Sequence, residues 1–336
     1  MAEAILEVKE LSTHFFTDSG EIPAVDQVSF TVHKGEVVGV VGESGSGKSV
    51  TSLSILQLIP KPPGKIVNGS IFYKDENLAK ASEKRMKKIR GNEISMIFQE
   101  PMTSLNPVFT IGNQMREAIR IHQKVSKQAA TEKAIQMLKV VGIPRAEDIV
   151  NEYPHQLSGG MRQRVMIAMA MASEPSLLIA DEPTTALDVT IQAQILDLMK
   201  KINKEEQTSI LLITHDLGVV ADICDRVVVM YSGQVVEQGT TREILKDPKH
   251  PYTQGLIRSL PKLHGKEKKL YSIPGTVARP RKDHIGCRFA PRCEFAFERC
   301  FKENPQIYNL GEDRESRCFL HSEQEGERLK NVTTNT

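Results

Sequence analysis

The sequence contains no stretch of about 18 consecutive apolar residues, so no part of it is expected to span a bilayer. It also lacks an excess of one charge: the formal net charge is +2, too small to indicate nucleic acid or an anionic membrane as a partner. Residues 1–7 include acidic side chains and no apolar core, so we expect no signal peptide. These absences favour a cytoplasmic protein that is either soluble or peripheral to a membrane.

Cysteine is scarce and unevenly placed. Four of the five cysteines, Cys287, Cys293, Cys300 and Cys318, lie in the last fifth of the chain. In a reducing compartment such a group favours a metal or cluster site over disulfides. Four thiolates in one loop-rich segment can bind either Zn²⁺ or a 4Fe-4S cluster. The fifth, Cys224, lies in an apolar helical stretch and is expected to be a small buried residue.

Residues 42–49, Gly-Glu-Ser-Gly-Ser-Gly-Lys-Ser, fit the phosphate-loop pattern G-x-x-x-x-G-K-S/T at every fixed position. The β-branched residues 37–41 before them predict a buried strand, and residues 52–59 after them predict a helix. Such a loop aims backbone N–H groups at phosphates, while Lys48 reaches the β- and γ-phosphates and Ser49 holds Mg²⁺. The expected nucleotide contacts of this segment are Gly42, Glu43, Ser44, Gly45, Ser46, Gly47, Lys48, Ser49 and Val50.

Polar side chains follow three further predicted strands. Asp181 and Glu182 end the apolar residues 177–182, Gln99 follows residues 94–98, and His215 follows residues 209–213. Asp181 and Gln99 are placed to bind Mg²⁺, and Glu182 to orient or deprotonate the attacking water. A histidine beyond a strand's carboxyl end can contact a γ-phosphate. We therefore expect Glu182, His215, Lys48 and Gln99 to be the catalytic residues.

A second anion-binding element follows two predicted helices, residues 111–121 and 127–141, which interrupt the alternation of strand and helix. Ser158, Gly159 and Gly160 stand directly before a predicted helix over residues 162–172. A serine hydroxyl, unpaired N–H groups and a positive helix end favour phosphate. Near the N-terminus, Phe15 or its neighbour Phe16 is a candidate for stacking on the base, with core packing as the alternative.

Taken in order, the phosphate loop, Gln99, residues 157–161, Glu182, Asp188 and His215 resemble the motifs of the ATP-binding subunits of ABC transporters. The resemblance implies an α/β P-loop NTPase of the ABC ATPase type, with a RecA-like core, an antiparallel β subdomain and a helical subdomain, followed here by a small Cys-rich C-terminal extension. It also implies that two such domains pair head to tail. In that arrangement Ser158, Gly159 and Gly160 of one domain meet the ATP held by the phosphate loop of the other. The resemblance also makes Asp188 a candidate nucleotide contact.

One residue departs from that family's pattern. Met161 stands where the family most often has glutamine. The serine and glycine positions of this motif carry the contacts to ATP in the family, so we expect little loss of activity.

Four segments look like those of the oligopeptide and dipeptide importers: residues 42–45, 99–107, 157–164 and 286–293. This resemblance implies a peripheral protein on the cytoplasmic face of the cell membrane. Its implied partners are two transmembrane permease subunits, a paralogous ATP-binding subunit or a second copy, and, indirectly, an extracytoplasmic binding protein, with no nucleic acid. It also favours the 4Fe-4S cluster in the four-cysteine segment, with Zn²⁺ and no metal as the alternatives.

Three alternatives remain open on the sequence. The same machinery could import nickel or oligosaccharides. A soluble ABC ATPase acting on nucleic acid or ribosomes is disfavoured because the chain has neither a second cassette, nor a long coiled-coil insertion, nor a basic stripe. An iron-sulfur regulatory protein could use ATP only as a switch.

The domain organisation follows from these motifs. We expect a nucleotide-binding domain over residues 1–260, with its helical subdomain at about residues 100–172. The four-cysteine extension then occupies residues 261–321, and residues 322–336 form a polar tail that is expected to be disordered.

Overall fold

The computed structural model describes residues 3–99, 105–185, 187–260, 271–278 and 280–322. The strands are β1 Ala4–Thr17, β2 Gly20–His33, β3 Val37–Val41, β4 Gly64–Tyr73, β5 Glu76–Asn77, β6 Ile94–Ile97, β7 Leu177–Asp181, β8 Ser209–Thr214, β9 Arg226–Tyr231, β10 Gln234–Thr240, β11 Tyr308–Gly311 and β12 Arg314–Ser316. The helices are α1 Lys48–Ile55, α2 Glu83–Ile89, α4 Ile111–His122, α5 Lys127–Val140, α6 Ala146–Ile149, α7 Gly159–Met171, α8 Val189–Glu206, α9 Leu217–Ile223, α10 Thr241–Lys246, α11 Pro251–Arg258 and α12 Glu298–Lys302.

The chain forms two compact units, each built from separate segments. Unit 1 comprises residues 1–7, 31–37 and 72–214, and unit 2 comprises residues 8–30, 38–71 and 215–336. Among the described residues, no helix has both the length and the apolar content needed to cross a membrane.

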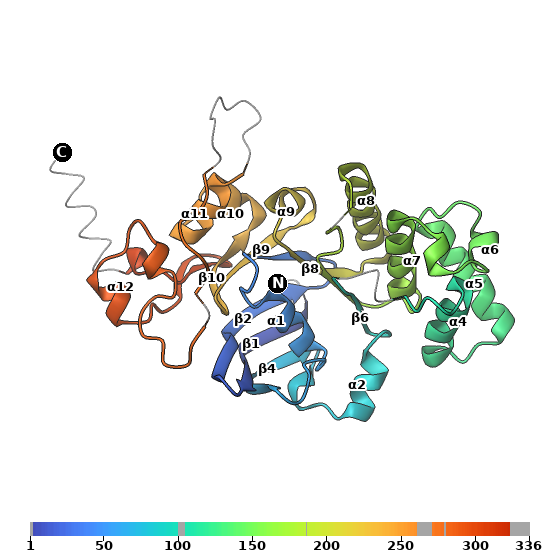
Figure 1. The fold of residues 1–336 in the computed structure, drawn as a ribbon, viewed down its shortest axis with the longest axis horizontal. Coiled ribbons are helices and arrows are strands. Elements are labelled where there is room, and N and C mark those ends of the chain that lie inside the picture. The colour runs from blue at the N-terminus through green and yellow to red at the C-terminus, as the bar shows by residue number, and fades with distance from the viewer. Residues whose placement is uncertain (1–2, 100–104, 186, 261–270, 279, 323–336) are drawn as a thin grey trace. The chain divides into compact units, whose positions relative to one another are not determined.

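Unit 1 contains three neighbouring parallel strands, in the order β6-β7-β8. Every residue of β7 and β8 is buried, as expected for parallel strands covered on both faces. The helices α4 to α7 lie together as one group in this unit (Figure 1). Thr110 and Ser126 cap α4 and α5, because their hydroxyls accept the N–H groups of Asn113 and Ala129.

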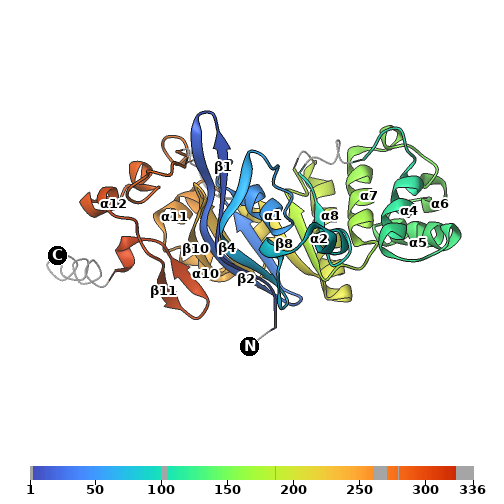
Figure 2. The ribbon, with the colours of Figure 1, turned by 90° about the horizontal axis from the view of Figure 1, so that it is seen from below.

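Unit 2 is built around β3, which pairs with β9 in parallel, from Val38 opposite Arg226 to Val41 opposite Val229. β10 pairs with β9 as an antiparallel hairpin, and β12 and β11 continue the sheet beyond β10. The C-terminal extension therefore contributes strands to the same sheet as the phosphate-loop strand. The long strands β2, β1 and β4 neighbour one another in that order in a further sheet, and they lie side by side in Figure 2.

The predicted elements are confirmed, with shifted ends at the two anion-binding segments. α1 begins at Lys48, four residues before the predicted start at residue 52, because the glycine loop leads straight into the first helical turn. α1 ends at Ile55. Just beyond this end, the N–H of Leu58 donates to the carbonyl of Leu53 within the helix. α7 begins at Gly159, three residues before the predicted start at residue 162, because Ser158 caps it by accepting the N–H of Met161.

The predicted burial of Cys224 is confirmed, since its exposed fraction is 8%. It caps the C-terminal end of α9 rather than lying within the helix. Several sequence predictions fall on residues outside those described: 100–104 of the stretch after Gln99, and all of the predicted tail except Ser322.

Candidate functional site

The phosphate loop, residues 42–49, joins β3 to α1 in unit 2. Gly42 and Gly47 both have positive φ angles, 155° and 99°, and a Cβ at either position would collide with a backbone carbonyl oxygen, of Met230 and Ala24 respectively. Only glycine fits there. The Lys48 ammonium points into the curve of the loop and donates to the carbonyl oxygens of Gly42 at 2.7 Å and Glu43 at 3.1 Å.

The remaining loop residues leave an open surface for an anion. Ser44 and Gly45 are exposed, and no atom lies within 4 Å of a Cβ built on Gly45. Ser49 and Val50 lie half-buried in the first turn of α1, which carries no acidic side chain. The positive helix end and Lys48 therefore converge on one loop, as phosphate binding requires.

In unit 1, the structure brings two predicted catalytic residues together. The Gln99 amide donates to the Glu182 carboxylate at 3.2 Å, and the Thr185 hydroxyl donates to the same oxygen at 2.9 Å. Glu182 has a φ of 49°, a left-handed conformation that is uncommon outside glycine, and its N–H donates to the carbonyl of Ile213 at 2.8 Å. The backbone thus turns sharply after β7 and holds the carboxylate beside Gln99.

Asp181 immediately precedes this turn and has an exposed fraction of only 4%. A buried carboxylate at a strand end is a suitable oxygen ligand for Mg²⁺, directly or through water. Asp181 and Gln99 of unit 1 and, separately, Ser49 of unit 2 each carry an oxygen atom of the type that a hard divalent cation prefers.

Ser158, Gly159 and Gly160 form the start of α7, also in unit 1. Ser158 and Gly159 are exposed, and a Cβ on Gly159 would meet nothing within 4 Å. A Cβ on Gly160 would press on Ile191, so the starts of α7 and α8 pack closely. Asp188 caps α8 by accepting the N–H of Ile191 at 3.0 Å. This helix end presents an open N-terminal turn to an anion.

Phe15 and His215 belong to unit 2. Phe15 is half-buried, with its ring next to Gly64, whereas Phe16 is 49% exposed. His215 is exposed and directly follows β8 in the chain, while the next residue, Asp216, caps α9 through the N–H of Gly218. The predicted ATP contacts are therefore distributed over both units.

The four C-terminal cysteines line a single cavity in unit 2. Its walls also include Phe289, Phe297 and Phe319. Burial raises the pKa of the Cys287 thiol, and that of Cys293 to about 11 and Cys318 to about 12. In the part of the chain that the structure describes, no three His, Cys, Asp or Glu side chains are close enough together to hold one metal ion.

Two further contacts to the phosphate loop were not predicted from the sequence. Arg292 forms an ion pair with Glu43, and the hydroxyl oxygen of Tyr252 accepts the backbone N–H of Glu43. Arg292 falls within residues 286–293, which indicated only a resemblance to the peptide importers. No periodicity or spacing distinguishes it from the neighbouring Arg288.

Comparison with known families gives two matches along the chain. The family described as ABC transporter matches residues 25–185. The family described as Oligopeptide/dipeptide transporter, C-terminal region, matches residues 236–300.

Similar curated proteins cover nearly the whole chain. The oligopeptide transport ATP-binding protein AppD of Bacillus subtilis is 55% identical over 96% of this chain and 98% of its own length. OppD of the same organism, with the same description, is 52% identical over 94% of this chain and 88% of its own length. The dipeptide transport ATP-binding protein DppD of Haemophilus influenzae is 48% identical over 96% of this chain and 97% of its own length.

Solved structures resemble the chain over a smaller part of its length. An ATP-binding cassette, solved as a dimer in a post-hydrolysis state with ADP and phosphate bound, has a TM-score of 0.64 at 28% identity, covering 70% of this chain and 99% of that one. The similarity confirms the predicted ABC cassette fold.

Proposed function

The chain belongs to the ATP-binding subunits of oligopeptide and dipeptide ABC transporters, and on that basis we propose how its residues use ATP. It is the ATPase subunit of a peptide import system. The curated relatives named above are all described as oligopeptide or dipeptide transport proteins, which favours peptides over nickel or oligosaccharides as the cargo.

Hydrolysis is assigned to Glu182, assisted by Gln99. The observation that supports this is the 3.2 Å hydrogen bond between the two side chains, at a left-handed turn that fixes the carboxylate. Glu182 accepts a proton from the attacking water, and Gln99 orients that water. His215 contacts the γ-phosphate, Lys48 the β- and γ-phosphates, and Phe15 or Phe16 stacks on adenine.

Mg²⁺ supplies charge neutralisation for the phosphates when it is bound with ATP. Ser49, Gln99 and Asp181 are the side chains that would hold it. The burial of Asp181 supports this role, because a carboxylate shielded from water interacts more strongly with a cation.

Two ATP-binding subunits pair head to tail around ATP in this proposal. The exposed start of α7, with Ser158, Gly159 and Gly160, supplies the second phosphate contact, and Asp188 lies at the same helix pair. A dimeric cassette among the similar solved structures supports such pairing. The second subunit is a paralogue or another copy of this chain.

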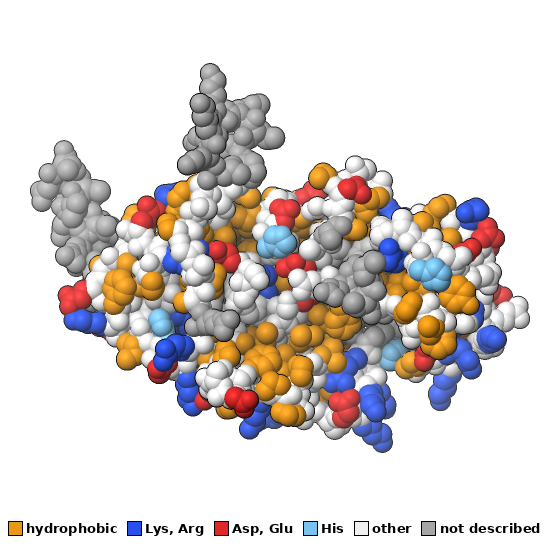
Figure 3. Space-filling view, viewed as in Figure 1, with side chains coloured by type: hydrophobic (Ala, Val, Ile, Leu, Met, Phe, Trp, Pro, Cys, Tyr) orange, Lys and Arg blue, Asp and Glu red, His pale blue; other side chains and the backbone are white. Residues whose placement is uncertain are grey.

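Partners at the membrane follow from the transporter family. We assign two permease subunits and, indirectly, an extracytoplasmic binding protein, with this chain on the cytoplasmic face. Hydrophobic side chains gather over the helical group around α4 (Figure 3). Val108, Phe109 and Ile121 are 50–70% exposed, which supports docking of a permease segment at this helical region.

The four-cysteine cavity is proposed to hold a 4Fe-4S cluster, with Zn²⁺ as the alternative. All four thiols line one cavity, and four cysteine ligands suit either group, so the resemblance to the peptide importers is what favours the cluster. Burial opposes the thiolate forms, so a cationic iron-sulfur core would offset that cost. Iron, sulfide and zinc analysis after purification without oxygen decides between the two. The division into residues 1–260 and a 261–321 extension belongs to the same proposal.

The test of the proposed chemistry is Glu182→Gln in the assembled transporter. We expect ATP turnover to fall by roughly 10²–10³-fold, since a general base is lost, while ATP stays bound. Glu205→Gln, an exposed change near the end of α8, is the matched control and should leave turnover unchanged. Unaltered hydrolysis in Glu182→Gln would contradict the assignment of Glu182 as the general base. Absence of hydrolysis in the wild-type complex would favour a role for ATP as a switch alone.

A further inference from the structure

The C-terminal extension contacts the phosphate loop through one arginine. Arg292, which precedes Cys293, forms a bidentate ion pair with Glu43, the second residue of the loop: Nη1 lies 2.8 Å from Oε2 and Nη2 lies 3.0 Å from Oε1. The Arg292 side chain is 5% exposed and that of Glu43 32%. Two parallel hydrogen bonds fix the direction of the carboxylate as well as its distance.

Arg292 is itself held in place by the extension. Its Nε donates to the carbonyl of Pro274 at 2.8 Å and Nη2 to that of Ile273 at 3.3 Å. The guanidinium carbon lies 5.7 Å from the ring centre of Tyr231 and 6.0 Å from that of Phe289.

A second contact holds the backbone of Glu43. Its N–H donates to the hydroxyl oxygen of Tyr252 at 2.8 Å. The ring of Tyr252 packs edge to face against Tyr231 and Phe289, with ring centres 4.7 Å and 5.4 Å apart. Phe289 lies between Cys287 and Cys293 in the chain and lines the cysteine cavity. The cavity wall and the phosphate loop thus share one aromatic cluster.

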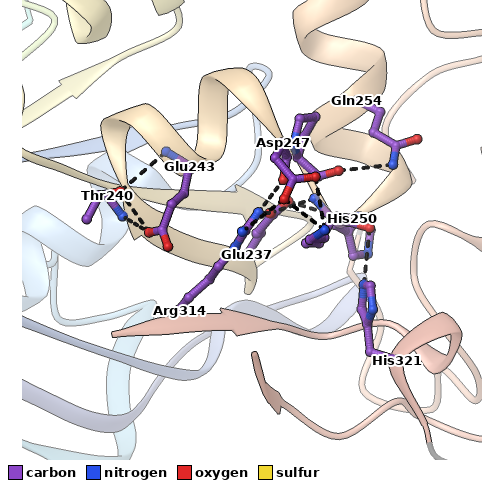
Figure 4. Close-up of polar contacts among 10 residues, drawn as sticks. Glu237, Thr240, Glu243, Asp247, His250, Gln254, Arg314 and His321 are labelled. Atoms are coloured by element: carbon purple, nitrogen blue, oxygen red, sulfur yellow. Dashed lines mark hydrogen bonds and ion pairs between the residues drawn. The ribbon is translucent and has the colours of Figure 1, made fainter. Parts of the chain in front are cut away.

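The extension also pairs with the rest of unit 2, and these contacts hold Arg292 in position. β12 pairs with β10, with Ser316 opposite Glu237. Figure 4 shows Arg314 reaching from β12 toward Asp247 and Glu237, and its Nη1 lies 3.2 Å from the Asp247 carboxylate. His321 contacts the carbonyl of Lys249 at 3.2 Å.

The charge of Glu43 matters because this carboxylate belongs to the loop that binds a triphosphate. An uncompensated carboxylate there would repel the phosphates. We propose that Arg292 is a positioning residue for ATP binding: it neutralises Glu43 and holds it away from the nucleotide, so that the folded extension sets the ATP affinity of the phosphate loop. The inference depends on the ATP-binding function above but not on which group the cysteines bind.

The test compares single and double substitutions in the full chain, by equilibrium binding of Mg-ATP and by the ATP KM and kcat of the assembled transporter. Arg292→Gln leaves Glu43 charged and unpaired, so the Kd and KM for ATP should rise by about tenfold while kcat changes little. Adding Glu43→Gln removes the repelling charge and should bring Kd back to within about threefold of the wild-type value. Arg281→Gln, which breaks an exposed arginine–aspartate pair in the same extension, is the matched control.

The outcomes separate this inference from the function on which it depends. If the wild-type chain did not bind ATP, the proposed ATP-binding function itself would be overturned. An Arg292→Gln affinity equal to that of Arg281→Gln would overturn the inference, and so would weakened binding that Glu43→Gln fails to rescue, since that pattern marks a purely structural arginine. If Arg292→Gln does not fold, the comparison passes to Arg292→Lys. It keeps the charge but loses the bidentate geometry, and its Kd should rise by only about threefold, whereas a Kd equal to the wild-type value would overturn the inference.

Discussion

At the scale of single residues, Gly47 of the phosphate loop offers a direct test of backbone geometry. Its φ is 99°, and a Cβ there would lie 2.5 Å from the Ala24 carbonyl oxygen. Gly45 also has a positive φ, 78°, but a Cβ there would meet nothing within 4 Å. The two glycines therefore share the strain of a left-handed backbone and differ in steric room.

We predict that Gly47→Ala abolishes measurable ATP binding, because the loop must shift to relieve the collision. Gly45→Ala should cost only the left-handed strain, about 1–2 kcal/mol, and retain weakened binding. Calorimetric titration with Mg-ATP compares them, and equal losses in the two variants would contradict the steric argument.

The sequence was sufficient to propose roles for those residues that follow a local spacing. These are the glycines and Lys48 of the loop, and Asp181 and Glu182 after an apolar run. Arg292 could not be found in this way. Its partner Glu43 is 249 residues away in the chain, and a long-range ion pair leaves no periodic signal. The left-handed conformation of Glu182 was likewise invisible, since glutamate has no preference for it.

At the scale of elements, the pairing of β12 with β10 attaches the extension to the nucleotide-binding core. Glu237 of β10 is fully buried and accepts the N–H groups of Lys249 at 2.7 Å and His250 at 2.8 Å. Burial raises its pKa above the ordinary 4.5. Arg314 of β12 forms an ion pair with this carboxylate, and its Nη2 lies 4.0 Å from Oε1 of Glu237.

Arg314→Met should destabilise the protein by roughly 2–3 kcal/mol at neutral pH, because it leaves a buried carboxylate with no cation beside it. The raised pKa of Glu237 gives the sign of the pH effect. Folding favours the protonated form, so the variant should regain stability relative to wild type as the pH falls from neutral through the raised pKa toward 4.5. Urea unfolding at a series of pH values measures this difference. A constant difference across the series would show that Glu237 does not carry the effect.

The boundaries of elements were less predictable than their existence. The strands β6 to β8 and the helices α4 and α5 lie within a residue or two of the predicted ranges, because their apolar patterns are strong. β11 and β12 were not predicted. They are short, and β12 follows a loop-rich segment whose pairing with β10 depends on contacts distant in the chain.

At the scale of the whole molecule, the proposed head-to-tail pairing depends on the open start of α7. Gly159 has room for a side chain, and an aspartate in the first turn of a helix is locally favourable. Gly159→Asp should therefore leave folding and phosphate-loop binding of ATP intact. It should reduce ATP turnover by at least about 10²-fold, because the carboxylate opposes the phosphate that this helix end must meet.

Gly159→Ala is the matched control, since it adds a Cβ without charge, and it should retain most of the turnover. Sedimentation of each Gly159 variant in the presence of Mg-ATP, with Glu182→Gln also introduced to prevent turnover, measures the dimer directly. Full turnover in Gly159→Asp would rule out a role for this helix end in the ATP site.

The central claim is that this chain hydrolyses ATP to power peptide import. The most direct measurement is ATP hydrolysis by the complex purified from native membranes and reconstituted in vesicles, with and without a peptide-loaded binding protein. We predict that two permeases and a second ATP-binding subunit accompany the chain and that peptide stimulates hydrolysis. Glu182→Gln should lower both hydrolysis and uptake by roughly 10²–10³-fold. Recovery of the chain with ribosomes or nucleic acid, or hydrolysis that is indifferent to peptide, would contradict it.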